Sequence, residues 1–366
     1  MMKNYLKLFA VLLTVPFFAV LFTNHWSTSA QTAQKQVETA GQKFKNIKVL
    51  NDMPADQLGK VMDLFSASLG VNCGFCHVED DFSKDDKRTK NTARQMIKMT
   101  FEINKNNFNS RPQVTCNSCH NGHEEPQNVP NLNPEPEPPR PIQPKDKPTA
   151  DQIVDKYLTA LGGTAKLATV KSRYIKANRV EPGGEVIEPE TIWFDNNRYA
   201  KSVEYSKATI NEGYDGTAAW KANGNQPIPL PAADLEQIRR EADLFAPQNI
   251  KAIYPTLNWR FVDLVDGKPA NVVLATTASG SRERLYFDAA TGLLVRRVAV
   301  TPTVLGNFVY QVDYLDYKLF GGVKVPTTIE YSMPGIRWTE KVVQVKNNVP
   351  VDAAKFAAPV KQQGGF

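Results

Sequence analysis

The chain has 366 residues, of which 42% are hydrophobic and 22% are charged, and its formal net charge is +6. This length is sufficient for two or three domains, and the composition is ordinary for globular protein. The charge is spread out, since residues 31–126 carry 13 Lys and Arg against 12 Asp and Glu. Without a basic block, the composition argues against a nucleic-acid-binding protein.

The first 30 residues have the pattern of an export signal. Two lysines lie beside an apolar run, Leu8–Phe22, and the small residues Thr28 and Ala30 then occupy the −3 and −1 positions of a cleavage site. The alternative is an uncleaved anchor helix, although Pro16 interrupts the run. In either case, we expect the rest of the chain to lie outside the cytoplasmic membrane, in the periplasm.

The four cysteines of the chain occur in two copies of C-x-x-C-H, at Cys73–His77 and Cys116–His120. Two thiols at this spacing can reach the two vinyl groups of one porphyrin, and the adjoining His can then bind the iron. The sequence therefore predicts two covalently bound haem c groups. Their predicted protein ligands are Cys73, Cys76 and His77 for the first haem and Cys116, Cys119 and His120 for the second.

A predicted helix precedes each motif. The first opens near Asp52 and ends at Gly70, with Leu58, Val61, Met62, Phe65 and Leu69 at helical spacing. The second covers Thr92 to about Asn104, with Asn91 as its N-cap and Met96 on its apolar stripe. Between them, the charged segment 79–88 is expected to be a solvated loop.

The residues alone leave the second axial ligand of each iron open. The chain has only four histidines, so two haems with paired His ligands are nearly excluded, and His123 is expected to be exposed to solvent. Methionine sulfur is the next candidate. Met62 and Met96 each lie on a helix before a motif, but packing in the core explains their positions equally well.

Residues 52–125 resemble the N-terminal half of the cytochrome c subunit family of photosynthetic reaction centres. The matching segments are 55–62, 70–77, 93–104 and 114–120. The resemblance implies that Met62 binds the first iron and Met96 the second, with Met99 as the fallback. Because this chain has two C-x-x-C-H motifs where that subunit has four, the resemblance supports dihaem electron transfer better than a photosynthetic role.

The cysteine-containing segment allows two other functions. Two Cys pairs could form a structural zinc site, but the His after each pair and the export signal argue against it. A haem peroxidase would require an open iron position, whereas a Met is available for each iron. We therefore expect an electron-transfer protein rather than an enzyme.

Nine prolines lie in residues 126–148, which favours an extended, semi-rigid linker. The predicted organisation is thus a signal peptide (1–30), a small α-helical dihaem cytochrome domain (31–125), this linker (126–148) and a β-rich domain (149–366). The last begins with a capping box at Thr149–Gln152 that predicts a helix. Beyond it, short alternating runs predict a curved antiparallel sheet, a half-barrel with helices over one face.

The predicted strands of this α+β domain are residues 173–180, 191–195, 198–205, 271–277, 284–288, 293–300, 308–317, 327–332 and 337–345, with a helical insert at 232–245. Short phrases at 286–293 and 321–326 resemble the periplasmic lipoprotein-carrier family. That resemblance implies a concave apolar face that could hold a hydrophobic ligand. The domain has neither His nor Cys, and we find no catalytic constellation in it.

The leading hypothesis is an exported dihaem c-type cytochrome that exchanges electrons with a redox protein or a membrane electron-transfer complex. The alternative is a periplasmic binding protein for a hydrophobic ligand, with the haems as an accessory module.

Overall fold

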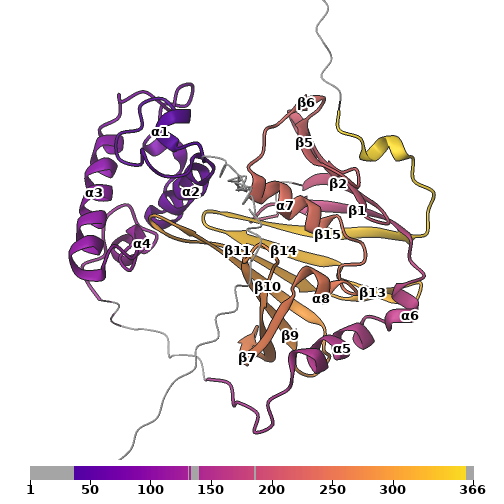
Figure 1. The fold of residues 1–366 in the computed structure, drawn as a ribbon. Coiled ribbons are helices and arrows are strands. Elements are labelled where there is room, and N and C mark those ends of the chain that lie inside the picture. The colour runs from indigo at the N-terminus through magenta and orange to yellow at the C-terminus, as the bar shows by residue number, and fades with distance from the viewer. Residues whose placement is uncertain (1–36, 131, 133–139, 185–186, 360–366) are drawn as a thin grey trace, which may run out of the picture. The chain divides into compact units, whose positions relative to one another are not determined.

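The computed structural model describes residues 37–130, 132, 140–184 and 187–359 (Figure 1). The predicted export signal and residues 133–139 of the Pro-rich segment lie outside the described residues. None of the helices in the described residues combines the length and the apolar character needed to span a membrane.

The N-terminal part of the described chain is helical, as predicted. Its helices are α1 (Ala40–Lys43), α2 (Leu58–Leu69), α3 (Arg88–Phe108) and α4 (Cys116–His120), with short 3-10 turns at Ala55–Gln57 and Cys73–Phe75. Helix α2 ends at Gly70, which adopts a left-handed conformation with φ 67°. The predicted helix and its end at Gly70 are confirmed, but α2 begins at Leu58, after the 3-10 turn, rather than near Asp52.

Helix α3 is longer than predicted. It begins at Arg88 after Lys87, so Asn91 is not its N-cap and instead accepts a hydrogen bond from the Arg94 side chain at 2.8 Å. The charged residues at its start gave no apolar periodicity from which the first turn could be read.

The buried core of the helical part is small. Val61 of α2 and Ile97 of α3 pack with Ala40, Leu50 and Met53 from the segment before α2. Leu305, from the connection between two strands of the sheet described below, is only 3% exposed and belongs to the same cluster.

The remainder of the described chain begins with helices α5 (Ala150–Ala160) and α6 (Thr164–Leu167). The predicted capping box is present, because Gln152 N donates to Thr149 Oγ1 at 3.2 Å and Thr149 N donates to Gln152 Oε1 at 2.9 Å. Helices α7 (Ala232–Glu241) and α8 (Ile250–Ile253) follow farther along the chain. The predicted insert at 232–245 is therefore helical only in its first part.

The described residues form a 13-stranded antiparallel sheet in the order β6-β5-β4-β3-β2-β1-β15-β14-β11-β10-β9-β8-β7. A separate hairpin is formed by β12 (Lys318–Phe320) and β13 (Val323–Val325). The strands of the sheet are β1 (Ser172–Val180), β2 (Ile187–Asp195), β3 (Arg198–Tyr205), β4 (Ala208–Tyr214), β5 (Ala219–Asn223), β6 (Gln226–Pro227), β7 (Thr256–Val265), β8 (Lys268–Thr276), β9 (Arg282–Asp288), β10 (Leu294–Thr303), β11 (Gly306–Leu315), β14 (Thr328–Met333) and β15 (Ile336–Asn347).

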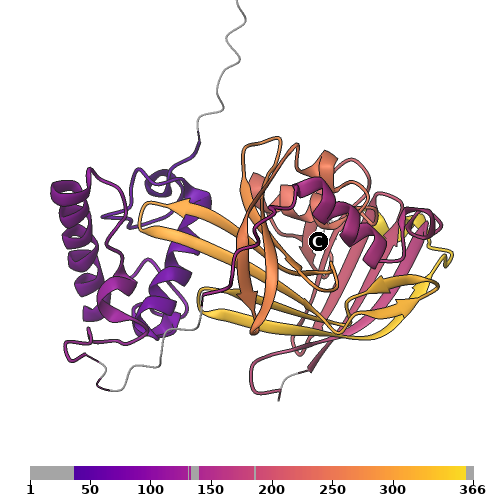
Figure 2. The ribbon, with the colours of Figure 1, turned by 90° about the horizontal axis from the view of Figure 1, so that it is seen from below.

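The predicted curved antiparallel sheet is confirmed, with helices α5, α7 and α8 on one side of it (Figures 1 and 2). All nine predicted strands correspond to observed ones within a few residues. Strands β4, β5, β6 and β7 of the sheet and the hairpin strands β12 and β13 were not among those predicted. In β7, a register shift between Trp259 and Phe261 breaks the alternation on which the prediction depended.

Apolar residues on α5 join the helix to the sheet. Tyr157 packs edge-on against Phe287 of β9 with 5.3 Å between ring centroids, and Val154 is 1% exposed in the same cluster. The Pro-rich segment is joined to strand β7 of the sheet by the side chain of Gln143. Its Oε1 accepts from the Val262 N–H at 2.8 Å, and its Nε2 donates to the Val262 carbonyl at 2.9 Å.

Candidate haem-binding site

The first C-x-x-C-H motif lies in a tight turn directly after α2. The Cys73 carbonyl accepts hydrogen bonds from the N–H groups of Cys76 and His77, at 3.3 and 2.9 Å. These two bonds close the backbone of the motif into a turn. Cys73 is exposed and Cys76 is half-buried, and burial raises the pKa of the Cys76 thiol.

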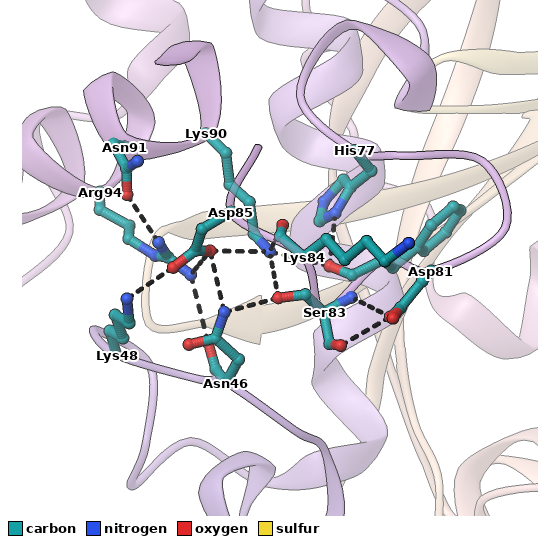
Figure 3. A network of polar contacts seen from close by, with 11 residues as sticks. Asn46, Lys48, His77, Asp81, Ser83, Lys84, Asp85, Lys90, Asn91 and Arg94 are labelled. Atoms are coloured by element: carbon teal, nitrogen blue, oxygen red, sulfur yellow. Dashed lines mark hydrogen bonds and ion pairs between the residues drawn. The ribbon is translucent and has the colours of Figure 1, made fainter. Parts of the chain in front are cut away.

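The imidazole of His77 is oriented by the loop that follows the motif. Its Nδ1 lies 3.0 Å from the Phe82 carbonyl oxygen, and the Phe82 ring packs against it with 4.9 Å between centroids (Figure 3). A carbonyl can only accept, so Nδ1 carries the proton. The lone pair of Nε2 is then available, which is the arrangement of most metal-binding histidines.

The loop that holds His77 is itself held by Lys90 of α3. The Lys90 ammonium donates to the carbonyls of Phe82, Ser83 and Lys84, at 2.8, 3.1 and 2.7 Å, and the residue is only 9% exposed. The acceptor of the His77 proton is thus one of three carbonyls bound by a single cation (Figure 3). The sequence predicted a solvated loop at residues 79–88, and that prediction did not include the hydrogen bonds from Lys90 that hold the loop.

Asp85 lies at the centre of the surrounding ion network. Its carboxylate contacts Arg94 at 2.8 Å, Lys48 at 2.5 Å and Lys90 at 3.3 Å, and it accepts a hydrogen bond from Asn46 at 2.8 Å (Figure 3). The hydrogen bond from Arg94, followed by those from Lys48 and Asn46, holds the pKa of Asp85 far below its usual range. The network therefore joins the loop to α3 and to the segment before α2.

The second motif forms helix α4. His120 Nδ1 lies 3.0 Å from the carbonyl oxygen of His123, so this imidazole also presents Nε2. The His123 side chain is exposed, as predicted, and the residue contributes through its backbone. The two motif histidines are thus supported in the same way, by carbonyls five and three residues farther along the chain.

Asn104 of α3 fixes the backbone that enters the second motif. Its Oδ1 accepts from the N–H groups of Gln113 and Val114, at 3.1 and 2.9 Å, and its Nδ2 donates to the Val114 carbonyl at 2.7 Å. Asn104 is 4% exposed, so its buried amide is satisfied by three hydrogen bonds to this backbone.

A cavity of about 360 Å³ adjoins the Cys116 thiol. Leu64 and Phe65 of α2 line its wall, together with Leu305 from the β10–β11 connection. Burial raises the pKa of Cys116 to about 11, so this thiol stays protonated at neutral pH. An uncharged thiol beside an apolar wall is suited to contact with a porphyrin edge.

The backbone after the second motif contacts the C-terminal end of α2, which precedes the first motif. Gly122 follows the second motif, and Ser68 lies near the end of α2, before the first motif. The Gly122 N–H donates to the Ser68 carbonyl at 2.8 Å. A Cβ atom on Gly70 would lie 2.2 Å from the Gly122 carbonyl oxygen. Only glycine therefore allows this approach at residue 70, in addition to its left-handed conformation.

The predicted methionine ligands lie in different surroundings. Met62 is half-buried beside the core that contains Val61. Met96 and Met99 are 38% and 43% exposed on α3, whereas Ile97 between them is buried. Met96 and Met99 are therefore not held by core packing, while Met62 has partial core contacts. Their roles as iron ligands remain predictions.

The donor set fits two haem c groups, because each motif provides two thiols and an imidazole with its Nε2 lone pair available. In the described residues, no three His, Cys, Asp or Glu side chains converge as a metal site, so the four cysteines are not gathered as zinc would require. The supports that sequence reasoning missed are Phe82, Asp85, Lys90 and Asn104. Neither spacing nor residue type marked them, because each acts through contacts made only in the folded chain.

Residues 19–163 match the family model described as the photosynthetic reaction centre cytochrome C subunit. The photosynthetic reaction center cytochrome c subunit of Roseobacter denitrificans is 33% identical over 102 residues, which cover 25% of this chain and 28% of the relative. Cytochrome c-554 of Chloroflexus aurantiacus is 29% identical over 105 residues, covering 27% of this chain and 25% of the relative. The chain thus spans about a quarter of the length of these relatives.

Two solved structures resemble the sheet-containing part. A DUF1329 family protein from Desulfovibrio piger and a LolA superfamily protein from Nitrosomonas europaea each align with a TM-score of 0.40, at 12% and 13% identity. Each alignment covers 57% of this chain and 97% of the other. Similarity at this level carries no functional information. For the N-terminal part, the resemblance noted in the sequence is confirmed: residues 19–163 are similar to the reaction centre cytochrome c subunit family.

Proposed function

We propose that this chain is an exported dihaem c-type cytochrome that transfers electrons between redox partners in the periplasm. The observation that carries the proposal is the matched support of His77 and His120, each of which donates its Nδ1 proton to a backbone carbonyl. Haem, when bound, supplies an iron that cycles between the ferrous and ferric states. The chain's own residues hold and orient it.

The residues have separate roles in this proposal. Cys73, Cys76, Cys116 and Cys119 attach the two porphyrins, and His77 and His120 bind the irons through Nε2. Met62 and Met96 complete the axial pairs, which would favour the reduced iron and raise its potential. The partner would be a redox protein or a membrane electron-transfer complex, as the similarity of residues 19–163 to the reaction centre subunit suggests.

The domain boundaries of the proposal follow the sequence prediction. Residues 31–125 would bind the haems, 126–148 would link them to the sheet, and 1–30 would direct export. The proposal involves no bond chemistry on a substrate.

The test is an absorption spectrum of the chain produced in a host that attaches haem c. We expect the bands of reduced c-type haem at two haems per chain. His120→Ala should alter the spectrum of one haem, whereas His123→Ala, the matched control, should leave both unchanged because His123 acts through its carbonyl. A purified protein with free thiols and without haem would refute the proposal.

A second candidate function, binding of a hydrophobic ligand, is favoured by one observation in the sheet-containing part. A cavity of about 370 Å³ lies among α5, α8 and the sheet, with mostly apolar walls. This volume falls within the usual range for small-molecule sites.

A further inference from the structure

The cavity in the sheet-containing part has a largely aliphatic wall. Helix α5 contributes to it, and so do α8 and the central strands of the sheet. The aliphatic residues that line it include Leu161, Ile175, Ile192, Ile250, Leu285 and Ile329. Such a wall suits a flexible hydrocarbon chain, which gains stability from the apolar surface removed from water.

Most charged residues in this wall already have partners of opposite charge. Lys201 is paired with Glu190 and with Glu340, the latter at 3.5 Å. Arg297 contacts Glu283 at 3.3 Å and Glu241 at 3.7 Å. Each of these two cations therefore already has carboxylates beside it and needs no charge from a ligand.

Arg173 of β1, Lys324 and Asp243 are the exceptions, although the Asp243 carboxylate accepts hydrogen bonds from the Phe245 N–H and the Asn249 amide. Arg173 lines the cavity, and its Nε donates to the neutral Asn347 side chain at 2.8 Å, but no carboxylate of the described residues lies within ion-pair distance of it. Burial lowers the pKa of Arg173 to about 10, so the guanidinium remains charged at neutral pH. A charge held at an apolar wall without a counter-charge is costly unless something else compensates it.

A second cation lies on the neighbouring hairpin. The Asn347 amide that accepts from Arg173 also donates to the Phe320 carbonyl of β12, at 3.0 Å. Lys324 of β13 also lines the cavity and is likewise without an acidic partner in the described part of the chain. The hairpin side of the cavity therefore carries positive charge that the surrounding side chains do not balance.

We propose that this cavity binds an amphiphile with a single aliphatic chain and an anionic head group, a long-chain carboxylate, with Arg173 as the residue that binds the head. The guanidinium presents parallel N–H donors that match the two oxygens of a carboxylate. This inference deepens the second candidate function and is independent of electron transfer.

The test measures binding of cis-parinaric acid, a fluorescent long-chain carboxylate, and of its methyl ester to the full haem-loaded chain. We expect the acid to bind at least about tenfold more tightly than the ester, because charge-assisted hydrogen bonds form only with the acid. Arg173→Gln should remove this preference, and Arg173→Lys should retain part of it. Arg337→Gln is the matched control, since Arg337 is exposed on β15 and does not line the cavity.

The outcomes distinguish binding of a hydrophobic ligand in the cavity from recognition of its carboxylate by Arg173. Equal binding of acid and ester by the unmodified chain would overturn the role of Arg173 but leave hydrophobic-ligand binding intact. Failure of both probes to bind would overturn both. Circular dichroism of each variant identifies a folding defect, and the Arg173→Lys variant keeps the head-group proposal testable if Arg173→Gln is unfolded.

Discussion

At each motif histidine, one ring nitrogen is already committed to a backbone carbonyl, and this single bond sets the protonation of the ring. The Nδ1 atoms of His77 and His120 both lie 3.0 Å from their acceptors. Because the proton is on Nδ1, the other nitrogen can act as a ligand without a prior proton transfer. The residues beside the motifs therefore leave Nε2 of each imidazole free to bind the proposed haem iron.

The predicted axial methionines can be tested one residue at a time. Met96→Ala should lower the midpoint potential of one haem or give a high-spin iron, because a thioether ligand favours the reduced state. Redox titration with electron paramagnetic resonance measures both effects. Met99→Ala is the matched control, being similarly exposed on the same helix. If Met99→Ala changes the iron and Met96→Ala does not, the assignment of Met96 is wrong.

Glu340 makes stability depend on pH. Glu340 is buried beside Lys201 and Glu190, and burial raises its pKa to about 7. The charge of Glu190 also raises this pKa, whereas the charge of Lys201 lowers it. A carboxyl whose pKa is raised on folding stabilises the fold below its unfolded pKa, and this stability is lost as the pH rises towards 7.

Glu340→Gln should therefore be more stable than the unmodified chain at pH 8, by on the order of 1–3 kcal/mol, with the difference shrinking towards pH 4. Urea unfolding at a series of pH values provides the measurement. Glu330→Gln on β14, where the side chain is only partly buried, serves as the control. A Glu340→Gln variant that loses stability equally at every pH would contradict this account.

At the scale of the element, the loop after the first motif and helix α3 act as one support. Lys90 binds three consecutive loop carbonyls, one of which also holds the His77 proton. Asp85 adds a link to Lys48, in the segment before α2. Ion pairs and hydrogen bonds therefore connect the loop, α3 and the segment before α2, which are separated in the sequence.

Lys90→Met should loosen this loop and shift the midpoint potential of the first haem without affecting the second. The fold should lose about 1–3 kcal/mol, because carbonyls that accepted from a cation are left without it. Lys98→Met, at an exposed position of the same helix, is the control. Redox titration checks the potentials, and unchanged values in Lys90→Met would show that the loop does not tune the first haem.

At the scale of the whole molecule, the β10–β11 connection takes part in the helical core. Leu305 is 3% exposed and clusters with Val61 and Ile97, while Val304 beside it is 41% exposed. The same connection lines the cavity at Cys116. The environment of the second motif is therefore completed by residues from more than 180 positions later in the chain.

Leu305→Ala should cost about 2–5 kcal/mol of unfolding free energy in the helical part, as expected for a leucine removed from a packed core. Val304→Ala should change it by no more than about 0.5 kcal/mol, because that side chain is exposed. Urea unfolding followed at the haem absorption bands reports on the helical part. Equal effects of the two substitutions would mean that Leu305 is not part of this core.

The sequence by itself determined what depends on local chemistry. The spacing within C-x-x-C-H predicted the haem attachment points, which stay a proposal. Gly70 ended α2, the Thr149 capping box began α5, and alternation located most strands of the sheet. These features involve residues a few positions apart, where steric and hydrogen-bonding preferences act directly on the chain.

Only the tertiary structure decided what the motifs and the sheet are surrounded by. The clamp of Lys90 on the loop, the insertion of Leu305 into the helical core and the unbalanced charge of Arg173 at the cavity wall each depend on contacts between segments far apart in sequence. No residue type or spacing encodes such a contact locally. It exists because the folded backbone brings the groups together and excludes water from around them.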